Sequence, residues 1–255
     1  MLHSPFRHLA RSVVASALIS SGAFAADTLQ CLVFKPLPVA SDGRLDGTVV
    51  NACAKAVTAY KFELKILHSD GTSAVIRSLG ADFLPGMASA SPGSGIGALL
   101  PGEERTRYMT TVQAWQMQKP ISGTEITAQC VVFEDAAAVG DEQEIGFVFR
   151  DRQDLRREWT FWKQSFEKYR DKLANESPMA SLIGMSNVRT RQRTMNPTHS
   201  PMLVEVQANA VQGMLEWADK AIESGKMSRA EAIQWLDGFF AATVSNYDKH
   251  SERRK

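Results

Sequence analysis

The chain has 255 residues, with 29 basic and 28 acidic side chains and a formal net charge of +1. A chain so close to neutrality lacks the basic excess that is typical of nucleic-acid-binding proteins, and we expect no nucleic acid among its partners. Its length is sufficient for one large domain or two small domains with ordinary hydrophobic cores.

Residues 1–26 have the pattern of a secretory signal peptide. Arg7 and Arg11 precede an apolar run that ends in the small-residue segment Ala23-Phe24-Ala25. A membrane anchor is the alternative, but serines interrupt the run, which is shorter than the roughly twenty residues needed to cross a bilayer. We therefore expect a periplasmic or secreted protein with no transmembrane segment after cleavage of the signal.

The stretch 27–150 consists of short apolar segments separated by turn residues, a pattern typical of β-strands. The clearest strand alternates Tyr60, Phe62, Leu64 and Ile66 with mostly polar residues, which predicts one buried face. Asp70-Gly71 predicts a hairpin turn after it. Gly and Pro are frequent in the region 80–102, which predicts a long surface loop. The last strand is expected to place one inward face at alternate positions, namely Ile126, Ala128, Cys130 and Val132.

The stretch 151–175 predicts a long amphipathic helix. Its apolar residues recur at spacings of three and four, which forms one stripe along a helix. The stripe consists of Leu155, Trp159, Trp162, Phe166, Tyr169 and Leu173.

Residues 201–250 predict a helical hairpin. Gly225 is a natural helix stop, and Ser228 with Glu231 has the spacing of a capping box at the start of the next helix. The first helix is expected to bury Leu203, Val206, Ala210, Met214, Trp217 and Ala221. The second is expected to bury Ile233, Leu236, Phe240, Val244 and Tyr247. Residues 176–200, with Arg189, Arg191 and Arg193, are expected to be a mobile basic linker whose arginines face solvent; a polyanion or anionic lipid is the alternative contact.

Several turn and strand segments give the first half a resemblance to a known type of domain. They are Gly47 to Asn51, Lys55 to Tyr60, Asp70-Gly71, Leu100 to Glu103 and Val131 to Asp135. In these segments the chain resembles the immunoglobulin-like or fibronectin-III-like β-sandwich domains of exported bacterial proteins of unassigned function. Such domains usually have a glycine directly after the Glu-Asp pair, where this chain has Ala136. The resemblance implies an all-β antiparallel sandwich for this half. Together with the helices predicted above, we expect an α+β chain in which the sandwich is followed by an all-α segment of about three helices.

The resemblance also implies a disulfide across the core between the second and sixth strands, which would join Cys53 to Cys130. Two alternatives remain open. Cys31 competes for Cys130, and all three cysteines are otherwise buried as small apolar residues.

The chain contains no arrangement of residues that is typical of catalysis or metal binding. No histidine lies at metal-ligand spacing from another histidine or cysteine, and no Gly-x-Ser-x-Gly turn accompanies His68 or His199. Acidic residues gather between Glu134 and Glu144; a solvated turn is the simpler interpretation and a calcium site the alternative. We therefore name no catalytic residue, no metal ligand and no cofactor.

We expect an exported, non-catalytic binding or adaptor protein that contacts another envelope or extracellular protein. The binding-surface candidates are Leu84, Ile96 and Leu99 in the loop region and Trp159 and Trp162 in the first helix. A second hypothesis is a small hydrolase or lipid-handling protein with a pocket between sandwich and helices. A third is self-association through the helices.

Overall fold

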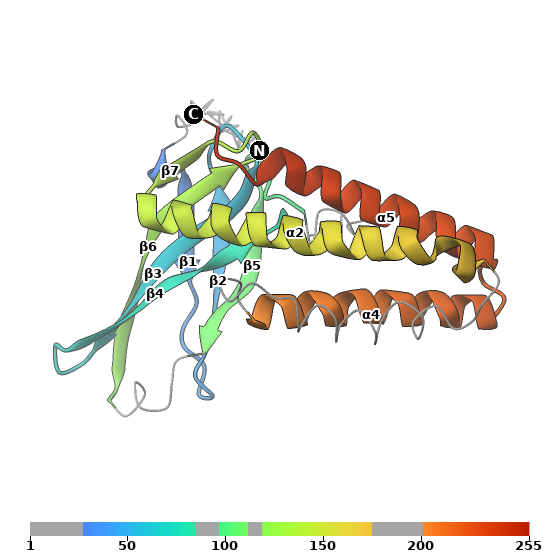
Figure 1. Ribbon diagram of the computed structural model, residues 1–255. Coiled ribbons are helices and arrows are strands. Elements are labelled where there is room, and N and C mark those ends of the chain that lie inside the picture. Colours follow the sequence, from blue (N-terminus) through green and yellow to red (C-terminus); the bar gives the residue numbers. More distant parts are fainter. Residues whose placement is uncertain (1–27, 85–96, 112–118, 175–200, 255) are drawn as a thin grey trace, which may run out of the picture.

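The computed structural model describes residues 28–84, 97–111, 119–174 and 201–254. Within these residues the protein is an α+β chain of two antiparallel sheets and three α-helices (Figure 1). The predicted signal peptide, the linker 176–200 and Ile96 lie outside the described residues.

The two sheets have three and four strands. The first sheet has the order β1 (Leu32–Pro36), β2 (Arg44–Asn51) and β5 (Glu104–Thr111), and a short 3-10 helix (Leu29–Cys31) precedes it. The second sheet has the order β4 (Ser73–Asp82), β3 (Val57–His68), β6 (Ile121–Phe133) and β7 (Ala138–Gly140). Leu45 and Val49 of the first sheet share one hydrophobic core with Phe62, Leu64 and Phe133 of the second.

The expected alternation in β3 is confirmed. Tyr60, Phe62, Leu64 and Ile66 are at most 3% exposed, while the residues between them are half-buried. The hairpin turn is confirmed as well, because Gly71 has a φ of +80° and the Asp70 carboxylate accepts the backbone N–H of Thr72. This φ lies in the left-handed region that glycine adopts at little cost.

The first long helix, α2 (Glu142–Leu173), begins before the expected position 151. Asp141 caps it by accepting the backbone N–H groups of Gln143 (2.9 Å) and Glu144 (3.0 Å), so the helix starts directly after β7. Its first turns cover the outer face of the second sheet, where Ile145, Val148 and Phe149 pack with Ala59, Cys130 and Val132.

The rest of α2 forms a bundle with α4 (Pro201–Glu223) and α5 (Arg229–His250). The predicted capping box is present: Ser228 Oγ accepts the N–H of Glu231 (3.2 Å), and the Glu231 carboxylate accepts the N–H of Ser228 (2.7 Å). Leu155, Trp159, Trp162, Phe166 and Leu173 are buried in the bundle core, as their spacing predicts. The bundle extends away from the sheets and touches them at one end (Figure 1).

The disulfide joins Cys31 to Cys53, whose Cα atoms are 4.8 Å apart, and Cys130 is a buried free thiol. The expected Cys53–Cys130 bond is therefore wrong. The pairing of β6 with β3 skips Gln129, which makes a bulge in β6. An extra residue in one strand reverses the side on which the following side chains lie. Cys130 consequently faces α2, while Ile126 faces the core between the sheets.

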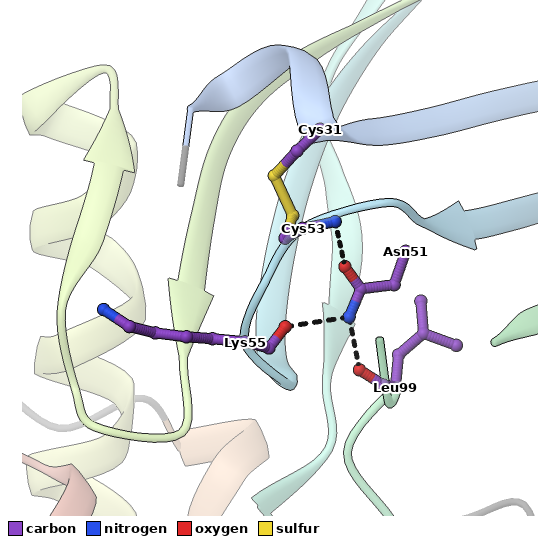
Figure 2. Close-up of a disulfide and its surroundings, with 5 residues drawn as sticks. All are labelled: Cys31, Asn51, Cys53, Lys55 and Leu99. Atoms are coloured by element: carbon purple, nitrogen blue, oxygen red, sulfur yellow. Dashed lines mark hydrogen bonds between the residues drawn. A yellow bond between two sulfur atoms is a disulfide. The ribbon is translucent and has the colours of Figure 1, made fainter. Parts of the chain in front are cut away.

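Asn51 organises the backbone beside the disulfide (Figure 2). Its buried amide nitrogen donates to the carbonyl oxygens of Leu99 (2.7 Å) and Lys55 (3.0 Å), and its amide oxygen accepts the N–H of Cys53 (2.9 Å). The side chain thus bonds three backbone groups, and it gives the N–H of Cys53 a buried acceptor. The disulfide and this amide together fix the end of β2 against the first residues of the described chain.

Candidate functional site

The described residues of the expected binding surface lie in the two hydrophobic cores. Leu84 (0% exposed), Trp159 (4%) and Trp162 (1%) belong to the core of the bundle. Leu99 (0% exposed) belongs to the core between the sheets, and its backbone pairs with that of Val57. The structure therefore does not bring these residues together as an exposed surface.

A different aromatic pair is exposed on the helical hairpin. Trp217 of α4 is 50% exposed and Trp235 of α5 is 38% exposed, and their ring centroids are 4.9 Å apart. The contact continues inward from Trp235 to Phe239 (6.0 Å) and from Phe239 to Trp159 (5.7 Å). The exposed rings are therefore held in place by the bundle core, near the turn that lies farthest from the sheets (Figure 1).

Small residues flank this aromatic pair. Ala210 and Gly213 precede Trp217 at helical spacing and are exposed, as are Gly238 and Ala242 of α5. A Cβ atom added at Gly213 or Gly238 would meet no atom within 4 Å. Because these residues have short side chains or none, the surface beside the two rings is accessible to a partner.

The sequence pattern did not reveal this surface for two reasons. The spacing in α4 predicts that Trp217 and Ala210 face inward, which is wrong because both are exposed. The spacing in α5 makes no prediction for Trp235, which does not belong to the stripe of that helix. An aromatic residue outside the buried stripe was the available signal, since a large apolar side chain at a solvent-facing helix position needs an explanation.

Buried Arg152 forms the junction between sheets and helices. Its guanidinium donates to both carboxylate oxygens of Asp82, from Nε to Oδ2 at 2.8 Å and from Nη2 to Oδ1 at 3.1 Å. It also donates to Thr58 Oγ1 (3.0 Å) and to the carbonyl oxygen of His250 (3.2 Å). Thr58 in turn donates to the carbonyl oxygen of Phe133 (3.1 Å). One side chain of α2 thus connects β3, β4 and the end of α5.

Burial changes the acidity of groups near this junction. It raises the pKa of Asp151, and it lowers the pKa of His250, whose protonated form Arg152, Lys249 and Arg254 also disfavour. Burial raises the pKa of Tyr247 above its usual range. The charge of Arg152 acts on both Tyr247 and His250, which lie in the part of α5 that Arg152 joins to the sheets.

Two cavities among the described residues lie elsewhere. One of about 500 Å³ is lined by the loop after β1 and the start of β6. Another of about 520 Å³ lies where the end of α2 meets the start of α5. Neither lies between the sheets and the helices, where the hydrolase hypothesis expects a pocket. The described side chains also include no group of three His, Cys, Asp or Glu residues placed to hold a metal ion.

Comparisons with protein families, with curated proteins and with solved structures found no match to this chain. Among the helices that the structure describes, none has the length and apolar character needed to span a membrane.

Proposed function

We propose that this protein is an exported, non-catalytic binding or adaptor protein that recognises another protein of the cell envelope or the extracellular space. The observation that carries the proposal is the Trp217–Trp235 pair, with rings 50% and 38% exposed at a centroid distance of 4.9 Å. Tryptophan is enriched among the residues that dominate binding energy, because it covers a large area and loses little conformational freedom.

Two further observations support the location and the fold class in this proposal. The Cys31–Cys53 disulfide agrees with export, since disulfides persist mainly in oxidising compartments. The strand orders β1-β2-β5 and β4-β3-β6-β7 agree with an immunoglobulin-like sandwich in which β4 pairs with β3 in the four-stranded sheet. In this proposal the sheets form a rigid base and the helical hairpin carries the contact surface.

The rigidity of the aromatic pair supports a binding role. Trp235 packs on Phe239, which packs on buried Trp159. Side chains held in one orientation before binding lose less entropy when a partner covers them. The exposed glycines beside them leave space for a partner helix or loop to approach closely.

The test is affinity capture from a cell-envelope extract, followed by titration of the captured protein against purified variants. We expect Trp217→Ala/Trp235→Ala to lose at least about thirtyfold in affinity, the effect of one strong hot-spot residue. The matched control is Val75→Ala/Leu100→Ala, which removes apolar side chains that are 45% and 58% exposed on the sheet half. The control should bind as the unchanged chain does.

Circular dichroism of the tryptophan variant should retain the helical signal, since both rings lie at the surface of the bundle. A partner that binds both variants equally would contradict the proposal. A chain that captures only itself, with a mass that falls on dilution in light scattering, would replace it with self-association.

A further inference from the structure

Residues 250–254, which we call the latch, lie across the junction between the sheets and the helices. They follow the last turn of α5 and run beside β7 (Figure 1). The backbone N–H of Arg254 donates to the carbonyl oxygen of Ala136 (3.0 Å) in the turn between β6 and β7. The Arg253 guanidinium donates to both carboxylate oxygens of Glu142 (2.6 and 3.2 Å) at the start of α2. The latch therefore attaches the end of α5 to the second sheet and to α2.

The end of α5 buries polar atoms that have no hydrogen-bond partner among the described residues. They are Thr243 Oγ1, His250 Nδ1 and Ser251 Oγ. Nearer its start, α5 buries apolar side chains such as those of Leu236 and Phe240. Because a buried polar atom without a partner opposes folding, the last turns are the part of α5 that opens most readily.

The ion pairs that hold this end of α5 are exposed. Arg253 and Glu142 are 36% and 75% exposed at their side chains, and Arg156 and Asp248 are 44% and 46% exposed. Exposed ion pairs contribute little stability in water. Buried Arg152 bonds mainly within α2 and the sheets, and it donates one hydrogen bond to the end of α5. The attachment is therefore weak enough for one unfavourable charge to open it.

His250 is the group in the latch that can acquire such a charge. Burial lowers its pKa, and three neighbouring cations lower it further, namely Arg152 of α2, Lys249 of α5 and Arg254 of the latch. Asp82 of β4 acts in the opposite direction, and its carboxylate is paired with Arg152. A cation is normally favoured at the end of a helix, but here the Arg152 guanidinium already donates to the His250 carbonyl oxygen (3.2 Å).

We propose that residues 250–254 are an acid-released latch: when His250 gains a proton, the latch and the last turns of α5 leave the sheets, while the sheets and the far end of the bundle stay folded. The released imidazole binds the proton more readily because it is in water and away from Arg152. The closed state is therefore fully stable above the ordinary histidine pKa of 6.5, and it is lost as the pH falls through the lowered pKa of His250.

The test is hydrogen exchange of the full chain between pH 5 and pH 8, with each amide corrected for the pH dependence of its intrinsic exchange rate. Below pH 6.5 the protection of amides in residues 247–254 should fall by up to about tenfold per pH unit, because opening takes up one proton. Amides of β3, such as those of Phe62 and Leu64, should keep their protection.

His250→Gln tests the origin of this response. The variant removes the titrating group and keeps the backbone carbonyl that accepts from Arg152, so protection of the latch should no longer depend on pH. The matched control is His68→Gln, which replaces the histidine at the end of β3 and should keep the response of the unchanged chain.

Arg253→Ala tests the attachment. It removes both bonds to Glu142, so the latch should lose protection at every pH while the change per pH unit stays the same. Lys226→Ala removes an exposed lysine from the turn between α4 and α5 and should leave the latch unchanged.

The proposal is overturned if protection of the latch is the same across the pH range, or if His250→Gln retains the fall. Parallel loss of protection in β3 would also overturn it, because the whole chain would then be unfolding. Trp217→Ala/Trp235→Ala should show the pH response of the unchanged chain. Failure of the proposed function and failure of the latch are therefore distinguishable.

Discussion

The sheets and the helical bundle are stabilised in different ways. In the sheet half, contacts join residues distant in sequence: strands pair in register, and the Cys31–Cys53 disulfide and Asn51 fix the end of β2. In the bundle, the aromatic stripes of α2 and α5 pack with an aliphatic stripe of α4 that includes Val211 and Leu215. The two halves meet around Arg152 and in the small cluster formed by Ile145, Val148 and Phe149.

This difference suggests that the helical half depends on its junction with the sheets more than the sheets depend on it. Within the described residues, the bundle meets the sheets at one end (Figure 1). The junction concentrates several hydrogen bonds on one guanidinium. A change there should affect the coupling between the halves, whereas changes within the sheets should affect one half alone.

The largest effect is expected for Arg152→Ala. Its removal leaves the Asp82 carboxylate and the Thr58 hydroxyl without their buried partner, and breaking a buried ion pair in this way costs about 3–5 kcal/mol of unfolding free energy. Arg152→Lys should lose less unfolding free energy, although lysine cannot contact both carboxylate oxygens of Asp82 as arginine does. Urea unfolding followed by tryptophan fluorescence, which reports the bundle, and by hydrogen exchange of strand amides, which reports the sheets, measures the loss.

The two signals test the junction itself. If Arg152 couples the halves, the variant should show separate transitions for the tryptophan-rich bundle and for the sheets. The matched control is Arg156→Ala, whose partner Asp248 is 46% exposed at the side chain and whose loss should cost below about 1 kcal/mol. Equal losses at Arg152 and Arg156 would show that burial of the junction contributes nothing.

The next effect concerns the sheet half. Replacing Cys31 and Cys53 by alanine should lower the unfolding free energy by about 3 kcal/mol, the value for a loop closed over a sequence separation of 22 residues. Only the transition of the sheets should move once the halves are uncoupled by Arg152→Ala. Cys130→Ala is the control, and this variant should retain the Cys31–Cys53 disulfide. A non-reducing peptide map of the native chain should show the same bond. A map linking Cys53 to Cys130 would reverse the assignment.

Reactivity of the remaining thiol provides a further test of the same assignment. Burial raises the pKa of Cys130 to about 11. The thiolate is the reactive form, so alkylation at pH 8 should be slow in the folded chain and rapid in denaturant.

Local periodicity predicted most of the elements but not how they meet. The alternation around Phe62 and the stripe around Trp162 depend only on neighbouring residues, and both are confirmed. The capping box at Ser228 is local in the same sense. Such features are fixed by the geometry of a single helix or strand.

The features that local patterns did not reveal depend on tertiary contacts. The bulge at Gln129 reverses the side on which Cys130 lies, and a strict period of two assigns it to the wrong face. Arg152 finds Asp82 at a sequence separation of 70, and nothing near either residue signals the pair. Trp217 fits the spacing of a buried stripe, yet only the packing of three helices decides which edge of that stripe is exposed.

Two glycines close to the start of α2 offer opposite predictions. Gly140 has a φ of +124°, and a Cβ atom there would meet the carbonyl oxygen of Gln129 at 2.2 Å, so Gly140→Ala should cost about 2 kcal/mol. Gly146 lies within α2 with open space around it, so Gly146→Ala should stabilise by about 0.5–1 kcal/mol. Thermal unfolding of the two variants measures both changes in stability, the loss at Gly140 and the gain at Gly146. A loss at Gly146 would mean that the first turns of α2 cover the sheet more closely than described.

The smallest effect is a pH dependence at the end of α5. Burial lowers the pKa of His250 from its usual 6.5, and Arg152, Lys249 and Arg254 act in the same direction while Asp82 opposes them. The unfolded chain therefore binds a proton near pH 6.5, where the folded chain does not. Folding stability is complete above that pH and falls as the pH decreases through the lowered pKa.

His250→Gln should remove this dependence while retaining the backbone carbonyl that accepts from Arg152 at 3.2 Å. Urea unfolding between pH 5 and pH 8 measures the difference in unfolding free energy between the variant and the unchanged chain. This difference should vanish at the alkaline end of the range, and the variant should be the more stable at the acidic end. Because the shift arises partly from the charge of Arg152, the difference should shrink when Arg152→Ala is also present. An unchanged difference in that double variant would separate His250 from the junction and leave burial as the cause of the shift.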